Sequence, residues 1–567
     1  MNRVFILGWD GATFDLIEPW VAEGKLPNIA RIMEGGAHGR LRSTLPPMTF
    51  PAWSSFMTGK NPGKHGIYDF TRQRPGKYEL EFVNGGQRRA PSFWRLLSDA
   101  GRDVISISVP CTYPPEQVRG VMISGFDGPG QFGTAQVDRR GMHPPELYDE
   151  MKRETGGHPI GAFIANDINA GRPEQGLARM LETIKRKAAT AKYLMKSRPW
   201  DCMMMLFGES DGAGHHFWKY CDRRSPLFQS VPGMQDSILA VYQELDTQLG
   251  ELLKLMPEDT TLLMMSDHGF GGVSNWVLYP NCWLRSEGFM RFKGRGAQRL
   301  SRTLEGLKLR ALARLPGSVK QLLYKLGGAR IGRIESQVRY AMIDWPVSQA
   351  YFEENPYYPA LWINLKGRQP QGTVAPGAEY EAVRDRLIER LEAWVHPATG
   401  ERIVERAFRR EDVYCGPQLA EAPDIVVKWA TLQNYSYAFK LSAKSPDLAW
   451  IRQVDPNRPE NMEFFTGKSG HHRDDGIFLA QGKFIRPGSQ VEGAKIIDLA
   501  PTILHLLDVP IPSDMDGRII KSMFTADFDR EVTVGAAAPA TAAGDSTYSD
   551  EDEAVIAQRL KSLGYIE

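Results

Sequence analysis

The sequence has few cysteines and no long apolar stretch. Its five cysteines lie far apart, their number is odd, and none forms a C-x-x-C pair. No disulfide framework is therefore expected, and a reducing cytoplasm is the favoured compartment. The apolar run at residues 4–8 is too short for the core of a signal peptide. No stretch approaches the roughly 20 apolar residues that a membrane helix needs, so we expect a cytoplasmic protein without a transmembrane segment.

The sequence also has almost no net charge and no internal repeat. Its 567 residues carry 69 basic and 68 acidic side chains. The protein therefore lacks the overall positive field with which a bulk nucleic-acid binder neutralises phosphates. The 42% of hydrophobic residues exclude an extended disordered chain. A length prior gives roughly three to four domain-sized units, or one large α/β domain with insertions.

Continuous apolar runs alternate with amphipathic stretches along the chain. The apolar runs have the pattern of strands buried on both faces, and five of them are at residues 4–7, 104–109, 202–207, 260–265 and 476–480. Helical periodicity is found at residues 178–196, 235–255 and 380–395. Strands separated by helices predict an α/β fold with a mostly parallel central sheet, helices on both of its faces, and helical and α+β insertions.

The changes in patterning suggest six segments. We predict a catalytic α/β core in two parts, a basic helical insertion, a mixed α/β segment that partly forms a cap, a linker and a terminal helix. In chain order, the segments are core 1–290, basic insertion 291–345, mixed segment 346–470, core 471–530, linker 531–548 and helix 549–567.

The basic insertion has an unusual charge. Residues 291–339 contain 13 lysines and arginines but only two acids, Glu305 and Glu335. One interpretation is a helical insertion with a solvated basic face. The other is a lid, or a surface that meets an anionic substrate or makes peripheral contact with a lipid membrane. The pattern leaves both interpretations open, and it does not indicate an oligomeric state.

Aspartate and histidine recur where the predicted strands end. Ligands of open α/β sheets bind at the carboxyl ends of the strands, so these side chains are candidate metal ligands. Carboxylate oxygen and imidazole nitrogen together suit zinc, manganese or iron. The candidates are Asp10, Asp211, His215, Asp267, His268 and, from a loop before the last strand, His472 or its neighbour His471.

A hydroxyl is expected at the start of a nearby helix. Pro51 suits a first helical position, and Gly59 suits the residue after the helix end. Thr49 would then lie at a helix N-terminus, where free N–H groups and the helix dipole favour an anion. Beside a metal, this hydroxyl is a candidate nucleophile; alone, it is as well explained as a helix cap.

Together these motifs resemble the alkaline phosphatase superfamily, specifically the type I phosphodiesterase/nucleotide pyrophosphatase family. The resemblance rests on their order along the chain and extends to a C-terminal signature. The matching motifs are Gly8-Trp9-Asp10-Gly11, Thr49-Phe50-Pro51, Thr58-Gly59, His65-Gly66, Asp211-x-x-x-His215, Asp267-His268-Gly269, His472, residues 497–504 and Asp516-Gly517-Arg518.

The resemblance implies an enzyme with two divalent metal ions, zinc first among the candidates and manganese or iron next. One metal would be held by Asp211, His215 and His472. The other would be held by Asp10, Asp267 and His268, with the Thr49 oxygen bridging toward it. Thr49 would attack phosphorus and form a phospho-threonine intermediate. The implied substrate is a small phosphate ester, with nucleotides among the candidates.

The sequence departs from the family pattern at three points. The asparagine of the threonine motif is Ala52 here. Arg473 is a candidate replacement contact to substrate phosphate, and the alternative is an arginine at the surface or behind the ligands. His471 and His472 are adjacent, so the sequence does not decide which of them is the last ligand. His472 is favoured because it fits the family's motif spacing. No third metal site can be placed, because Glu209 lies at the wrong offset. Its absence would favour diesters over monoesters.

Three other activities stay open at this stage. The same site could transfer the phosphoryl group to an alcohol, a lipid or a glycan, hydrolyse monoesters, or bind phosphate without turnover. A sulfatase is not favoured, because position 49 is threonine and no C/S-x-P-x-R motif surrounds it.

Overall fold

The computed structural model describes residues 3–128, 136–294, 339–340, 342–456, 458, 468–528, 530–541 and 548–563. Most of the predicted basic insertion, residues 295–338, lies outside these ranges, as do parts of the linker and the last four residues. None of the helices in the described ranges combines the length and the apolar character needed to span a membrane.

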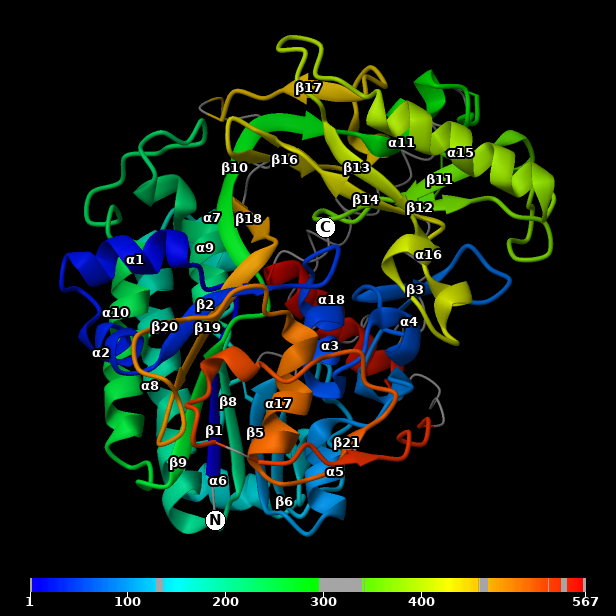
Figure 1. The fold of residues 1–567 in the computed structure, drawn as a ribbon. Helices are drawn as coiled ribbons and strands as arrows, with labels where there is room; N and C mark the ends of the chain where they lie inside the picture. Colours follow the sequence, from blue (N-terminus) through cyan, green and yellow to red (C-terminus); the bar gives the residue numbers. More distant parts are fainter. Residues whose placement is uncertain are drawn as a thin grey trace.

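The centre of the molecule is a nine-stranded, mostly parallel sheet, as the sequence predicts (Figure 1). Its strand order is β20 (Ser489–Gln490), β2 (Ala37–Arg42), β19 (Asp475–Gln481), β9 (Thr260–Met265), β1 (Arg3–Trp9), β8 (Cys202–Phe207), β5 (Val104–Val109), β6 (Gly120–Ser124) and β7 (Met142–His143). The strands from β9 to β6 run parallel. All five apolar runs predicted as strands lie in this sheet.

Helices cover both faces of the sheet because successive side chains of each strand point to opposite sides. In β1, Phe5 and Leu7 join one apolar cluster, while Val4 and Ile6 join another. On the first face lie α1 (Phe14–Ala22), α2 (Pro27–Gly35), α6 (Leu147–Thr155), α8 (Pro173–Ser197), α9 (Glu209–Cys221) and α10 (Ser237–Leu253). On the second lie α3 (Thr49–Thr58), α5 (Phe93–Asp99) and α17 (Leu499–Leu506).

A cap rises from the carboxyl edge of this sheet (Figure 1). The strand β10 (Gly269–Leu278) leads into it and pairs with β16 (Tyr435–Phe439), β17 (Ile451–Gln453) and β18 (Gly470–Arg473), while β15 (Thr431–Leu432) pairs with β16. A second cap sheet holds β11 (Ala350–Glu353), β12 (Ala360–Ile363), β14 (Ile425–Trp429) and β13 (Val404–Arg409), and the helices α11 (Pro280–Ser286) and α15 (Ala378–Glu392) pack beside it.

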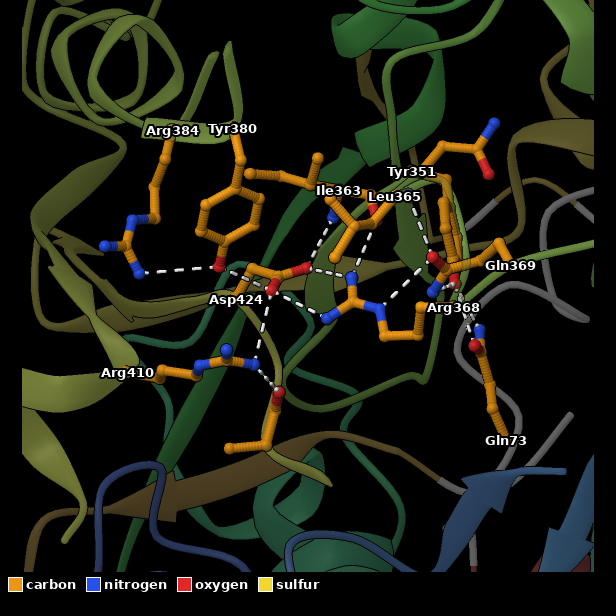
Figure 2. Close-up of polar contacts among 12 residues, drawn as sticks. Gln73, Tyr351, Ile363, Leu365, Arg368, Gln369, Tyr380, Arg384, Arg410 and Asp424 are labelled. Atoms are coloured by element: carbon orange, nitrogen blue, oxygen red, sulfur yellow. Dashed lines mark hydrogen bonds and ion pairs between the residues drawn. The ribbon is translucent and has the colours of Figure 1, made fainter. Parts of the chain in front are cut away.

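A buried carboxylate holds the second cap sheet together (Figure 2). Asp424 is fully buried and accepts hydrogen bonds from Arg368 (2.9 Å), from the Tyr380 hydroxyl (2.7 Å) and from the Ile363 amide (2.7 Å). Arg368 also donates to the Ile363 carbonyl at 2.7 Å. The Asp424 carboxylate therefore joins α15, β12 and the following loop.

We expect Asp424→Ala to lower the free energy of unfolding by about 3 kcal/mol, because it leaves the Arg368 guanidinium without its counter-charge. Urea unfolding followed by circular dichroism measures this loss. The matched control is Glu405→Ala, which breaks an exposed ion pair to Lys428 on the same sheet and should cost less than about 1 kcal/mol. Equal losses in the two variants would contradict this account.

The C-terminal helix α18 (Asp550–Leu563) docks against the core beside α3 (Figure 1). It starts with a capping box, in which Ser549 and Asp552 exchange hydrogen bonds of 3.1 and 3.2 Å. Ile556 and Leu560 lie in one apolar cluster with Phe50. The terminal helix is thus part of the packing around the start of α3.

A buried histidine links β5 to α8. The His158 ring nitrogens lie 2.6 Å from the Ser108 hydroxyl and 3.1 Å from the Thr190 hydroxyl, and the side chain is fully buried. Burial, together with the charges of Lys187 and Arg186, lowers the pKa of His158 to about 3. The folded protein therefore holds this imidazole in its neutral form.

Because the folded pKa is depressed, this group stabilises the protein above about pH 6.5, and the contribution is lost as the pH falls toward 3. We expect the free energy of unfolding of the wild type to fall by about 1.4 kcal/mol more per pH unit than that of His158→Gln between pH 6 and pH 4. Denaturant titrations over this range test the difference. Parallel pH profiles would show that His158 titrates alike in both states.

Candidate active site

Two adjacent parallel strands bring three of the predicted ligands together. The strands β1 and β9 pair with Gly8 opposite Met265, so Asp10 and the Asp267-His268 pair both emerge at the same carboxyl edge. The Nε2 atom of His268 lies 3.5 Å from Asp10 Oδ1 and 3.3 Å from Asp267 Oδ2. All three side chains are buried.

A helix supplies the next two ligands from the other neighbour of β1. The strand β8 pairs with β1, and α9 begins two residues after β8 ends. Asp211 and His215 are one turn apart on α9, as expected from their spacing, and His215 Nε2 lies 3.2 Å from Asp211 Oδ1. The short β8–α9 connection therefore places both groups beside Asp10.

The last histidine comes from a strand, not from the loop that the sequence suggested. The residues Gly470–Arg473 form β18, in which His472 pairs with Phe270 of β10. His472 Nε2 lies 3.1 Å from His215 Nε2 and 3.4 Å from Asp211 Oδ1, and its ring stacks on His268 with centroids 3.6 Å apart.

The adjacent His471 faces away from this cluster. Successive residues of a strand point to opposite sides, and the His471 Nε2 atom donates instead to the Tyr357 carbonyl at 3.2 Å. The structure thus places His472, and not His471, beside Asp211 and His215.

Backbone carbonyls orient all three imidazoles. The Nδ1 atom of His215 lies 2.9 Å from the Gly470 carbonyl oxygen, and that of His268 lies 3.0 Å from the Gly269 oxygen. His472 Nδ1 lies 3.0 Å from the oxygen of Pro47. With a proton on each Nδ1, the three Nε2 lone pairs face the shared cluster. Such outer hydrogen bonds are typical of metal-binding histidines.

The charges of the cluster fit a divalent metal. Burial, with the charges of Asp267 and Asp211, raises the pKa of Asp10 well above its usual value, and burial raises that of Asp267 to about 8. Burial and the neighbouring His472 hold the pKa of His268 far below its usual range. Burial thus opposes charge on both carboxyls and on this imidazole, and a bound dication supplies the missing compensation.

Hydrogen bonding supports the same conclusion. Asp10 Oδ2 accepts from the Trp53 indole at 3.1 Å, and Asp267 Oδ1 accepts from the Gly11 amide at 3.2 Å. Within the described part of the chain, Asp10 Oδ1, Asp267 Oδ2 and His268 Nε2 are buried and make no hydrogen bond. Ligating atoms of Asp10, Asp267 and His268 lie within 4.8 Å of one another, as do those of Asp211, His268 and His472. This oxygen and nitrogen donor set suits zinc, manganese or iron.

The candidate nucleophile stands at the start of α3. Thr49 is the first residue of the helix and is fully buried, Met48 is its N-cap, and Pro51 is the third helical residue rather than the first. Gly59 ends the helix with φ +65° and donates to the Ser55 carbonyl at 2.9 Å, as the sequence predicts. The Pro47–His472 hydrogen bond ties the segment before Thr49 to the metal cluster.

The residue predicted to bind phosphate has other partners. The Arg473 guanidinium donates to the Asn434 carbonyl at 2.8 Å, to the Gly272 carbonyl at 3.3 Å and to Ser436 Oγ. Strand alternation turns it to the side of β18 opposite His472. The structure therefore does not bring Arg473 into the ligand cluster.

Tyr357, which belongs to none of the sequence motifs, lies at the ligand cluster. The Tyr357 hydroxyl is 3.2 Å from His215 Nε2, and the residue belongs to the cap, just after β11. Sequence reasoning missed it because no spacing relates it to the ligands. Its neighbour Tyr358 borders two cavities between core and cap, of about 320 and about 280 Å³. Met48 lines the first cavity and His472 the second.

The family model for type I phosphodiesterase / nucleotide pyrophosphatase matches residues 4–451. The match covers most of the chain, so the protein belongs to this family, within the alkaline phosphatase superfamily, and is a phosphoester hydrolase of a metal-dependent group. The matched region includes Asp10, Thr49 and the ligands up to His268, but ends before His472. Comparison with curated proteins found no significant match.

One solved structure with a TM-score above 0.5 supports the alkaline-phosphatase-like fold, and another is similar at a lower score. Phosphonoacetate hydrolase from Sinorhizobium meliloti 1021, in complex with phosphonoformate, aligns with a TM-score of 0.51 and 15% identity over 90% of this chain and 96% of that chain. Human ectonucleotide pyrophosphatase / phosphodiesterase 5 aligns with a TM-score of 0.45 and 14% identity over 90% of this chain and 95% of that chain.

The two adjacent histidines offer a direct test of the metal site. We expect His472→Ala to reduce bound metal by about one equivalent per chain after dialysis, because metal sites lose affinity steeply with each missing ligand. The matched control is His471→Ala, which should keep the wild-type content because its imidazole contacts the Tyr357 carbonyl. Elemental analysis of zinc, manganese and iron gives the answer; metal loss in the control alone would reverse the assignment.

Proposed function

We propose that this enzyme is a two-metal phosphodiesterase or nucleotide pyrophosphatase that acts through a phospho-threonine at Thr49. Two contacts support the proposal. Thr49 is fully buried at the start of α3, the Trp53 indole of the same helix donates to Asp10, and the carbonyl of Pro47, just before the helix, contacts His472 of the buried aspartate and histidine cluster. The substrate would be a small phosphate ester, with nucleotides as one candidate class.

The ligands would be divided as the sequence suggests, with Asp211, His215 and His472 for one metal and Asp10, Asp267, His268 and the Thr49 oxygen for the other. When bound, two divalent ions supply positive charge to the attacking and leaving oxygens of an in-line displacement. The carbonyl-held imidazoles and the Trp53–Asp10 hydrogen bond keep the ligands in position before substrate arrives.

The reaction would proceed in two displacements at phosphorus. In the first, the Thr49 hydroxyl gives its proton to solvent, its oxygen bonds to phosphorus, and the bond to the leaving alcohol or phosphate breaks, while the other ester group of a diester stays on phosphorus. In the second, water attacks the phospho-threonine, the Thr49–phosphorus bond breaks, and the hydroxyl is restored. The positive end of the α3 helix dipole would stabilise the phosphoryl charge in both steps.

The preference for diesters is supported by the environment of Glu209. This carboxylate is buried on α9 near Asp211, but the Lys187 ammonium lies 2.9 Å from it, and both side chains are almost fully buried. The ion pair neutralises the acid that would otherwise be the nearest ligand for a third cation. A site limited to two cations compensates less charge, which favours the singly charged diester.

The test compares hydrolysis of bis-p-nitrophenyl phosphate with that of p-nitrophenyl phosphate, each with zinc, with manganese and with a chelator. We expect the diester to be cleaved faster, and Thr49→Ala to lose at least about a thousandfold in kcat. Thr49→Ser should keep substantial activity, because it retains the hydroxyl. Mass spectrometry of acid-quenched wild type should find the added nitrophenyl-phosphoryl group of the diester on Thr49.

Other outcomes point to other reactions. Faster cleavage of the monoester would indicate a phosphomonoesterase and refute the diester preference. A rate that rises steeply with added alcohols, with phosphorylated alcohol as product, would identify a transferase. Hydrolysis that persists in Thr49→Ala would refute the covalent route.

A further inference from the structure

Tyr357 reaches the active site from the cap. Its ring stacks on His472 with centroids 4.9 Å apart and meets the His215 ring edge-on at 5.2 Å. It also lies in one apolar cluster with Met48 and Phe50, the two chain neighbours of Thr49. The phenol therefore contacts two of the predicted ligand histidines from the cap side, and its residue belongs to the same apolar cluster as the neighbours of Thr49.

The backbone around Tyr357 is held on both sides. Asn355 Oδ1 accepts the amide hydrogens of Tyr357 (3.0 Å) and Tyr358 (2.6 Å), and Asn355 Nδ2 donates to Asp69 of the core at 2.7 Å. His471 donates to the Tyr357 carbonyl at 3.2 Å. These contacts use no atom of the phenol ring. They fix its direction before any ligand binds, which is what an effective transition-state donor requires.

The Tyr357 hydroxyl is directed at the ligand cluster. It lies 3.2 Å from Nε2 and 3.5 Å from Nδ1 of His215, while that Nδ1 is also 2.9 Å from the Gly470 carbonyl oxygen. The two positions at which the sequence suggested a phosphate contact provide no comparable donor. Ala52 of α3 has only a methyl group, and the Arg473 guanidinium is hydrogen-bonded to carbonyls of β10 and the 434 loop.

We propose that Tyr357 is a catalytic residue that donates its O–H to a non-bridging oxygen of the phosphoryl group during transfer to and from Thr49. This role rests on the proposed function. The hydrogen bond to a developing charge contributes more in the transition state than in the ground state, since the donor is neutral, oriented and shielded from water. The cap thereby takes part in the chemistry as well as enclosing the substrate.

The test replaces only the hydroxyl. In Tyr357→Phe, we expect kcat for the diester to fall about 10²–10³-fold, as for loss of one oriented donor, with KM changed less than about threefold. Binding of orthovanadate or inorganic phosphate to the metal-loaded protein, measured by calorimetry, should weaken roughly 10–100-fold, as for one hydrogen bond to a charged group. Metal content and the unfolding midpoint should match the wild type.

The matched control is Tyr437→Phe. Tyr437 is a buried cap tyrosine, and its hydroxyl makes no hydrogen bond among the described residues, so kcat and anion affinity should stay unchanged. Tyr357→Phe with wild-type kcat and anion affinity would overturn the proposal. Loss of metal in this variant would overturn it too, by making Tyr357 a metal-holding residue. If the wild type cleaves neither ester, the proposed function fails, and anion binding still decides whether Tyr357 contacts phosphate.

Discussion

The structure is organised around three aspartates and three histidines buried at one edge of the central sheet. At short range in a medium of low polarity, like charges repel strongly, and a carboxylate removed from water is costly unless it is paired. Asp10 and Asp267 respond with raised pKa values. Asp211 is the exception, because the His215 and His472 rings outweigh its burial and hold its pKa well below the usual value. Much of the surrounding fold keeps this unfavourable cluster in place.

That positioning is done mainly by the backbone. The parallel pairing of β9, β1 and β8 brings three chain segments to one edge, and the antiparallel pairing of β18 with β10 sets His472 against His268. Backbone carbonyl oxygens contact Nδ1 of each imidazole and thereby set the direction in which its Nε2 points. Because these constraints come from strand register and not from flexible side chains, the cluster has little freedom to relax by moving apart.

The sequence was sufficient for the core and most of the cluster. Continuous apolar runs are typical of central parallel strands, which are buried on both faces. The i,i+4 spacing of Asp211 and His215 indicates that both lie on one face of a helix. The assignment around His472 was less complete, because the short strand β18 is defined by its partner β10 and has little pattern of its own. Strand alternation at that point turns Arg473 away, which a loop interpretation could not reveal. The position of Tyr357 at the site could not be predicted, because this residue approaches the ligands only when the cap folds onto the core.

The order of the ligands along the chain has a consequence for biosynthesis. Asp10, just after β1, precedes the whole cap in the sequence, whereas β18, with His472, and β19 follow it. At about 5–20 residues per second, roughly half a minute to a minute and a half separates the synthesis of the first ligand from that of the last. In the later part of this interval the ribosome-bound chain carries strands β1, β8 and β9 without the β18 and β19 segments that complete their surroundings. The complete set of predicted ligands thus exists only once β18 has been synthesised, and a fragment released before that point holds an incomplete set.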